Sequence, residues 1–182
     1  ISIIAVAICL IVTMVTYIHN AKASLDETIA QQYGQMDLLA GFDYGQGRTI
    51  SYELYEQVQL MEEVQAVSPV SLEMTTVEQL ESVYTLGVEN DALVKSRYHF
   101  NEDIEDGEVV ISQRIAELFN KQVGDTIAIE FKPYVVKEVL TPLPGAADVQ
   151  SVILANDTVR NWMAINDDEV GMYALVDIAK NA

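Results

Sequence analysis

Few side chains in this sequence could carry catalysis or hold a metal ion. The chain has two histidines, His19 and His99, and one cysteine, Cys9, at widely separated positions. A zinc site takes three or four such ligands, and this spacing offers no cluster of them. The sequence also lacks the G-x-S-x-G, H-E-x-x-H, G-x-x-x-x-G-K-S/T and G-x-G-x-x-G motifs. We therefore predict no catalytic residue, no metal site and no cofactor.

An acidic run between positions 102 and 108 is the strongest candidate for binding calcium. An EF-hand loop has oxygen ligands at its first, third and fifth positions and glycine at the sixth. With Gly107 at the sixth position, the third is Ile104, whose side chain has no oxygen. We interpret the run as a solvated acidic turn, with an irregular calcium site as the alternative. Its members are Glu102, Asp103, Glu105, Asp106 and Glu108.

The charge of the chain excludes one class of partner and favours another. Among 182 residues, 10 are Lys or Arg and 28 are Asp or Glu, which gives a net charge of −18. Nucleic-acid binding needs clustered basic residues, so we exclude nucleic acid as a partner. An acidic surface attracts cationic ligands, so a cationic peptide substrate is one interpretation, and solubility alone is the simpler one.

The first eighteen residues, Ile1–Ile18, contain no charged side chain. As a helix they would extend about 27 Å, close to the thickness of the hydrocarbon core of a bilayer. A secretory signal peptide is an alternative because Ala21-Lys22-Ala23 resembles a cleavage site, but the apolar run is too long and no basic segment precedes it. A buried core helix would show a polar face, which is missing. We therefore predict that residues 1–18 form part of a transmembrane helix, in a chain that begins inside a longer polypeptide.

The helical pattern continues beyond the apolar segment. Apolar residues recur at spacings of three and four at Ile18, Ala21, Leu25 and Ile29. This predicts a stalk helix over residues 19–34 that ends near Gly34. Lys22 is the only basic residue near the membrane end, whereas cytoplasmic flanks carry an excess of basic residues. We therefore place residues 19–182 on the extracytoplasmic side of the cell membrane.

Two strand–helix–strand units are predicted beyond the stalk, one near each end of the remaining chain. The first has strands at 36–44, 64–70 and 72–77, with Pro69 at an edge or bulge, and a helix capped by Ser51. The second has strands at 149–154 and 171–178, and a helix through Met163 that Asn156 or Asp157 caps. The pattern predicts an α+β fold in which two halves, residues 35–78 and 148–182, form one sheet.

Residues 79–147 are predicted to form an inserted, β-rich segment between these halves. Its strands are expected at 82–88, 108–111, 125–131 and 134–140, with a short helix at 113–120. The last two strands would form a hairpin across Lys132-Pro133.

The stretch from Gly107 to Leu140 is the most informative part of the sequence. It reads GEVVISQRIAELFNKQVGDTIAIEFKPYVVKEVL. It resembles the extracytoplasmic core domain of MacB/FtsX-type ABC-transporter permeases, in which a v-i-s-x-x-x-A-x-x-L-x-x-x-x-G-D-x-i-x-i string leads into an f-x-V-x-g-v-l strand. MEEVQAVSPV and SVYTLGVEND resemble the V-x-x-v-s-P and v-x-G-v strands of that family. Glu138 departs from the pattern, because the family often has a small residue there.

The resemblance implies both an architecture and a function. The halves 35–78 and 148–182 would form a porter-like subdomain, and residues 79–147 an inserted β-rich subdomain. Such permeases work as homodimers or heterodimers with a cytoplasmic ATP-binding subunit. This domain would then be non-catalytic, and would couple ATP hydrolysis to export of an envelope substrate, such as a peptide or lipoprotein, or to activation of a partner.

A membrane-anchored extracellular sensor or ligand-binding module is the alternative function. A single-span sensor predicts no further hydrophobic segment after Ala182, whereas a permease predicts three more. An exported enzyme ranks third because no catalytic motif is present.

Overall fold

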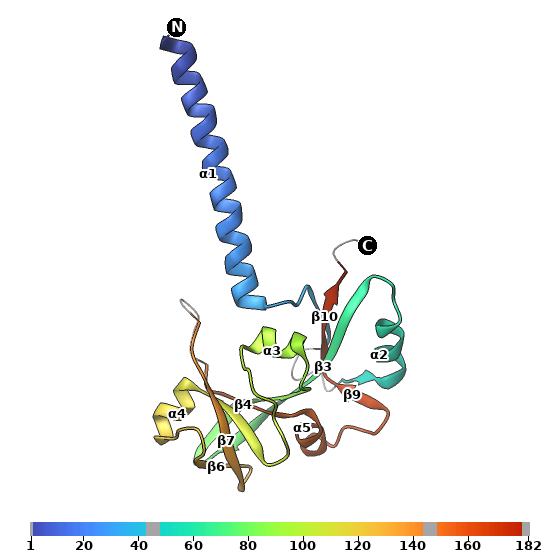
Figure 1. Cartoon of the computed structure of the whole chain (residues 1–182). Helices are drawn as coiled ribbons and strands as arrows, with labels where there is room; N and C mark the ends of the chain where they lie inside the picture. Colours follow the sequence, from blue (N-terminus) through green and yellow to red (C-terminus); the bar gives the residue numbers. More distant parts are fainter. Residues whose placement is uncertain (1, 43–47, 144–148, 180–182) are drawn as a thin grey trace.

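The computed structural model describes residues 2–42, 48–143 and 149–179. A long helix, α1 (Ser2–Tyr33), projects away from a domain built on a β-sheet (Figure 1). The side chains of residues 2–12 and of residue 15 are outside the description, and they include most of the predicted transmembrane segment. Among the described residues, no helix combines the length and apolar character needed to cross a bilayer. The membrane assignment of residues 1–18 therefore stays a prediction.

Eight strands form one sheet in the order β1-β10-β3-β4-β8-β5-β7-β6, and β2 and β9 form a small second sheet. The strands are β1 (Leu38–Gly41), β2 (Ile50–Ser51), β3 (Val64–Val77), β4 (Leu80–Val88), β5 (Glu108–Ser112), β6 (Thr126–Ile129), β7 (Lys132–Leu140), β8 (Ser151–Ala155), β9 (Glu169–Gly171) and β10 (Tyr173–Ile178). The remaining helices are α2 (Tyr52–Gln59), α3 (Ala92–Tyr98), α4 (Gln113–Phe119) and α5 (Asn156–Trp162). The predicted α+β class is confirmed.

The core lies on both faces of this sheet because successive side chains of a strand point to opposite sides. On β5, Val109 and Ile111 join an apolar cluster that includes residues of α4 and α5. Val110, between them, joins a second cluster that includes Leu93 of α3. Helix α3 therefore covers one face, and α4 and α5 cover the other.

The two predicted halves do not pair only with each other. Strands β1, β10 and β3 are neighbours, as expected, but β8 runs parallel to β4 and antiparallel to β5. One sheet thus continues from the predicted porter-like part into the predicted insert. The division into subdomains at residues 78 and 148 stays a prediction.

Strand β3 corrects the prediction of two separate strands. It runs for 14 residues without interruption, and Pro69 pairs with Ala174 of β10. Pairing with β4 on the other side begins only at Val70. Proline is tolerated inside the long strand because β3 has a paired strand on one side only at this position.

The start of α5 corrects a predicted cap. Its N-cap is Ala155, which makes no side-chain hydrogen bond to the helix, so neither Asn156 nor Asp157 is the cap. The Asn156 side chain is buried, and its Oδ1 accepts a 2.8 Å hydrogen bond from the hydroxyl of Ser71. Its Nδ2 donates to the carbonyl of Val170 and to Glu89, both at 3.1 Å. Asn156 therefore joins β3, α5 and β9 rather than capping a helix.

Two further differences concern the segment 79–147. The hairpin of β6 and β7 turns at Glu130 and Phe131, both with positive φ, rather than at Lys132-Pro133. Such φ values are typical of a tight type I′ hairpin turn, usually made by glycine or asparagine, so the residue types gave no signal. Helix α3 was also not predicted, although Asp91 caps it by accepting a hydrogen bond from the Val94 N–H.

Two buried serines of β3 test how hydrogen bonding stabilises this core. Ser68 and Ser71 are both fully buried, but the hydroxyl of Ser68 has no partner among the described residues. A buried hydroxyl without a partner has lost its hydration without compensation. We expect Ser68→Ala to raise the free energy of unfolding by about 1 kcal/mol, and Ser71→Ala to lower it by about 1–2 kcal/mol. Urea unfolding followed by Trp162 fluorescence measures both, and a destabilised Ser68→Ala variant would contradict the expectation.

Candidate functional site

The stalk helix is attached to the domain through α3. The backbone N–H of Gln35 donates a 3.0 Å hydrogen bond to the hydroxyl of Ser96, which itself donates to the Leu93 carbonyl at 2.8 Å. Arg97 donates to the carbonyl of Gln32 at 3.2 Å. We call this contact between the end of α1 and the last turns of α3 the stalk junction.

Aromatic rings hold the Arg97 guanidinium in place at the stalk junction. Its central carbon lies 5.3 Å from the ring centre of Tyr33, the last residue of α1, and 5.3 Å from that of Tyr98. Cation–π contacts of this kind contribute about 0.5–2 kcal/mol each. Arg97 thus contacts the stalk by a hydrogen bond and by a ring contact at once.

Gly34 makes the close approach of the two helices possible. It follows α1 with a φ of 62°, in the left-handed region that favours glycine. A Cβ at this position would lie 2.4 Å from the backbone carbonyl carbon and oxygen of Ser96. No other residue type fits without separating α1 from α3.

The end of β10 contacts Asp37, which follows the stalk junction in the chain. The N–H of Asp37 donates to the Val176 carbonyl at 2.9 Å, and the Asp37 carboxylate accepts from the Ile178 N–H at 2.9 Å. Strands β1 and β10 pair antiparallel, so the chain enters and leaves the sheet side by side. Figure 1 shows α1 and the end of β10 on the same side of the domain.

A buried tyrosine pair connects α3 to β10. The hydroxyl oxygens of Tyr98 and Tyr173 lie 3.0 Å apart. Burial raises the pKa of Tyr98 well above its ordinary value, and also raises the pKa of Tyr173. Both tyrosines therefore stay neutral and hydrogen-bonded at physiological pH. Together with the stalk junction, this contact makes α3 a bridge from α1 to the sheet.

The surroundings of His99 predict that acid weakens the stalk junction. It caps α3 with a φ of 61°, and it lines a hollow with Gln31, Gly34 and Glu27. Burial lowers the pKa of His99 below its ordinary value of 6.5, and the charge of Arg97 lowers it further, against a hydrogen bond with the Gln31 backbone. A lowered histidine pKa means that folding disfavours the protonated form, so we expect His99 to cost no stability above pH 6.5 and to lower stability as pH falls below it.

We therefore expect faster hydrogen exchange at the Gln35 and Ser96 amides at pH 5.5 than at pH 7.5, after correction for intrinsic rates. His99→Asn should remove this difference, because asparagine tolerates the left-handed conformation but does not titrate. An unchanged pH response in that variant would assign the effect to another group.

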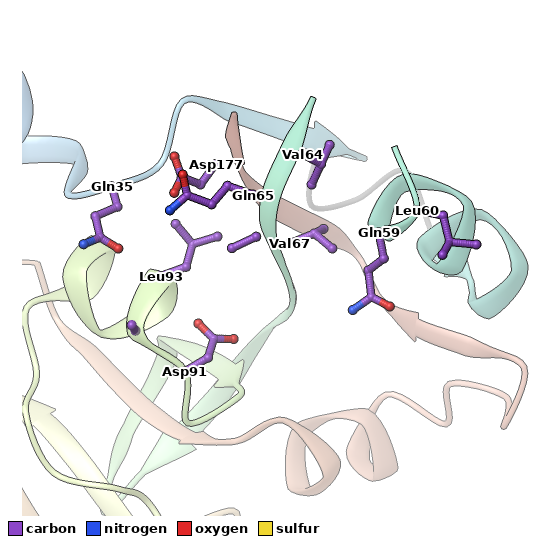
Figure 2. A pocket seen from close by; sticks show the side chains of 11 residues that line it. Gln35, Gln59, Leu60, Val64, Gln65, Val67, Asp91, Leu93 and Asp177 are labelled. Atoms are coloured by element: carbon purple, nitrogen blue, oxygen red, sulfur yellow. The ribbon is translucent and has the colours of Figure 1, made fainter. Parts of the chain in front are cut away.

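A cavity of about 700 Å³ opens beside the stalk junction (Figure 2). Its walls come from α3, the C-terminal end of α2, the first residues of β3 and the end of β10. They are Gln35, Gln59, Leu60, Val64, Gln65, Ala66, Val67, Asp91, Ala92, Leu93 and Asp177. Among the described residues, the lining combines apolar side chains with amides and two carboxylates and contains no lysine or arginine.

Residues of the acidic run form hydrogen bonds and an ion pair with neighbouring parts of the domain. Glu138, which departs from the small residue of the family pattern, accepts hydrogen bonds from the Asn101 and Glu102 backbone N–H groups. Lys137 pairs with Glu108 at 2.9 Å, and hydrogen bonds with the Glu105 backbone and Lys137 lower the pKa of Glu108. Over residues 2–42, 48–143 and 149–179, no three His, Cys, Asp or Glu side chains gather as metal ligands.

Tyr33 lies at the stalk junction, and the Tyr55 hydroxyl donates a 3.3 Å hydrogen bond to the Val67 carbonyl. The residues that matter most at the junction, Ser96 and Arg97, had no sequence signal. The sequence predicted no helix at α3, and only the glycine after the stalk marked this region.

The described residues form a mixed α+β sheet domain that follows a long helix, with β1 and β10 paired side by side. The family model of the MacB-like periplasmic core domain matches residues 1–180, so the chain belongs to this family. It is the extracytoplasmic domain of a MacB-like ABC-transporter permease, and permeases of this family work with a cytoplasmic ATPase.

Two solved structures share the fold. The periplasmic region of MacB from Actinobacillus actinomycetemcomitans matches with a TM-score of 0.57 at 14% identity, over 86% of this chain and 80% of that one. The extracellular domain of the noncanonic ABC-type transporter YknZ from Gram-positive bacteria matches with a TM-score of 0.52 at 14% identity, over 79% of this chain and 83% of that one. No curated protein matches the chain in sequence.

Proposed function

We propose that this domain couples ATP hydrolysis by a cytoplasmic partner subunit to work outside the membrane. The stalk junction is the observation that carries the proposal. Helix α1 ends in direct contact with α3, and α3 contacts β10 through the tyrosine pair. A displacement of α1 is thereby transmitted to the sheet through hydrogen bonds and packed side chains rather than through a flexible linker.

The pairing of β1 with β10 supports a lever. In this proposal residues 1–18 form part of a membrane helix, and a second membrane helix would follow the domain. Because β1 and β10 are paired, both connections act on the same edge of the sheet. Closure of the ATPase below the membrane would move α1, and the junction would turn that movement into a change of the outer domain.

The partners of the domain follow from this mechanism. The permease would act as a homodimer or heterodimer with its ATP-binding subunit, and residues 19–182 would lie outside the cell membrane. The domain itself would be non-catalytic. Its work would be export of an envelope substrate, such as a peptide or lipoprotein, or activation of a partner protein.

Purification of the full-length parent protein from its native membrane tests the proposal. After gentle solubilisation, mass spectrometry should find a cytoplasmic ATPase in stoichiometric amount. A sensor or ligand-binding module is the second candidate, because the cavity of Figure 2 offers a binding site. A copurified kinase, or no ATPase at all, would favour that sensor and overturn the coupling mechanism.

A further inference from the structure

One edge of β3 is open along its first half. Residues 64–70 pair with β10 on one side, and the pairing with β4 on the other side begins at Val70. Among the described residues, no strand occupies the second side between Val64 and Pro69. An open strand edge carries backbone N–H and C=O groups that can pair with another chain.

The register shows which backbone groups face this open edge. The Val176 carbonyl accepts a hydrogen bond from Asp37, so residue 176 of β10 faces away from β3. Backbone groups alternate along an antiparallel strand, so Leu175 and its partner Ser68 face each other. The groups of Val67, the next residue along β3, therefore face the open edge. Among the described residues, the Tyr55 hydroxyl donates a 3.3 Å hydrogen bond to the Val67 carbonyl.

The cavity beside the stalk junction lies along this edge. Residues 64–67 of β3 line it, with α3 as one wall and the end of α2 as the other. Figure 2 shows Val67 between Leu93 on one side and Gln59 on the other. Four strand residues extend over about 13 Å, so the 700 Å³ cavity has room for a short extended peptide.

The charge of the lining selects the kind of peptide. Asp91 and the buried Asp177 bring carboxylates, and no lysine or arginine among the described residues lines the cavity. The charges of Glu89 and Asp91 help to raise the pKa of Tyr55 above its ordinary value, behind the larger effect of burial. Leu60, Val64 and Leu93 supply apolar contacts beside these charges.

We propose that the open edge of β3 binds an extended, basic segment of a partner polypeptide as an added strand. Backbone hydrogen bonds to β3 provide affinity, and lysine or arginine side chains opposite Asp91 provide specificity. This binding does not depend on the coupling mechanism, because it concerns a surface of the domain and not the movement of α1.

Binding of the labelled octapeptide Lys-Val-Lys-Val-Thr-Val-Lys-Val to the full chain in nanodiscs tests the proposal by fluorescence anisotropy. The matched peptide with glutamate in place of lysine should bind at least tenfold more weakly. Asp91→Asn should weaken binding of the lysine peptide about fivefold or more, since asparagine still caps α3. The control Asp157→Asn removes an exposed charge on α5 and should leave binding unchanged.

Backbone methylation separates strand addition from attraction by net charge. N-methyl groups on one alternating set of residues should abolish binding, whereas the other set should have little effect, because only one edge of the added strand faces β3. Hydrogen exchange of the Val67 amide, whose N–H faces the open edge, should slow at least tenfold on binding. Equal binding of both methylated peptides, or of the glutamate peptide, would overturn the proposal. So would self-association of the chain through this edge that excludes the peptide.

Discussion

Asn156→Ala is expected to lower the free energy of unfolding by about 3 kcal/mol, the largest stability effect of any single polar substitution proposed for this domain. The alanine removes one side chain but leaves two buried partners without hydrogen bonds, the Ser71 hydroxyl and the Val170 carbonyl. Each buried group left unpaired costs about 1–3 kcal/mol. For a domain of this size the melting temperature should fall by roughly 10 °C.

Asn161→Ala is the matched control for this substitution. Asn161 lies on the same helix, but its side chain is exposed. Its replacement should change stability by less than about 0.5 kcal/mol. Thermal unfolding followed by circular dichroism compares the two variants. Equal melting temperatures would show that the Asn156 hydrogen bonds do not stabilise the fold.

Gly34→Ala is expected to detach the stalk helix from the domain while the sheet stays folded. The added Cβ would lie 2.4 Å from the backbone of Ser96, which cannot move like a side chain. The hydrogen bonds from Gln35 and Arg97 across the junction would then be lost. The Gln35 amide should exchange at least tenfold faster, and nucleotide-driven change in the outer domain should disappear.

Gly107→Ala provides the control for backbone strain. Gly107 also has a positive φ, of 82°, but no atom lies within 4 Å of the position where its Cβ would be. Both variants carry the strain of alanine in this region, about 1–2 kcal/mol, and only Gly34→Ala adds the clash. If the two variants had equal effects on the junction, strain rather than the contact with Ser96 would be the cause.

Local patterns in the sequence predicted the secondary structure where a residue type has a direct physical role. Ser51 caps α2 by accepting a hydrogen bond from the Leu54 N–H, as its position before the apolar spacing indicated. Gly34 follows the last residue of the stalk helix, and its φ of 62° is one that glycine adopts readily. The family resemblance, carried by the stretch from Gly107 to Leu140, was confirmed over nearly the whole chain.

Local sequence patterns could not predict contacts between residues that are distant in the sequence. Asn156 has the residue type of a helix cap, but Ser71, 85 positions away, uses its side chain in the core. The stalk junction depends on α3, a seven-residue helix with no apolar repeat of its own. Pro69 indicated a strand edge. The pairings of β3 with β10 and with β4 show that this edge belongs to the first half of one long strand.

The movement of the outer domain relative to the membrane tests the coupling mechanism most directly. A donor dye at Leu118→Cys, on the exposed surface of α4 and with Cys9 replaced by serine, would report energy transfer to acceptor-labelled lipid headgroups. The sample is the full-length permease with its ATPase in nanodiscs. We expect transfer to differ between the nucleotide-free and the ATP–vanadate states, and Gly34→Ala to abolish the difference. Equal energy transfer in the nucleotide-free and ATP–vanadate states of the permease that retains Gly34 would contradict the lever.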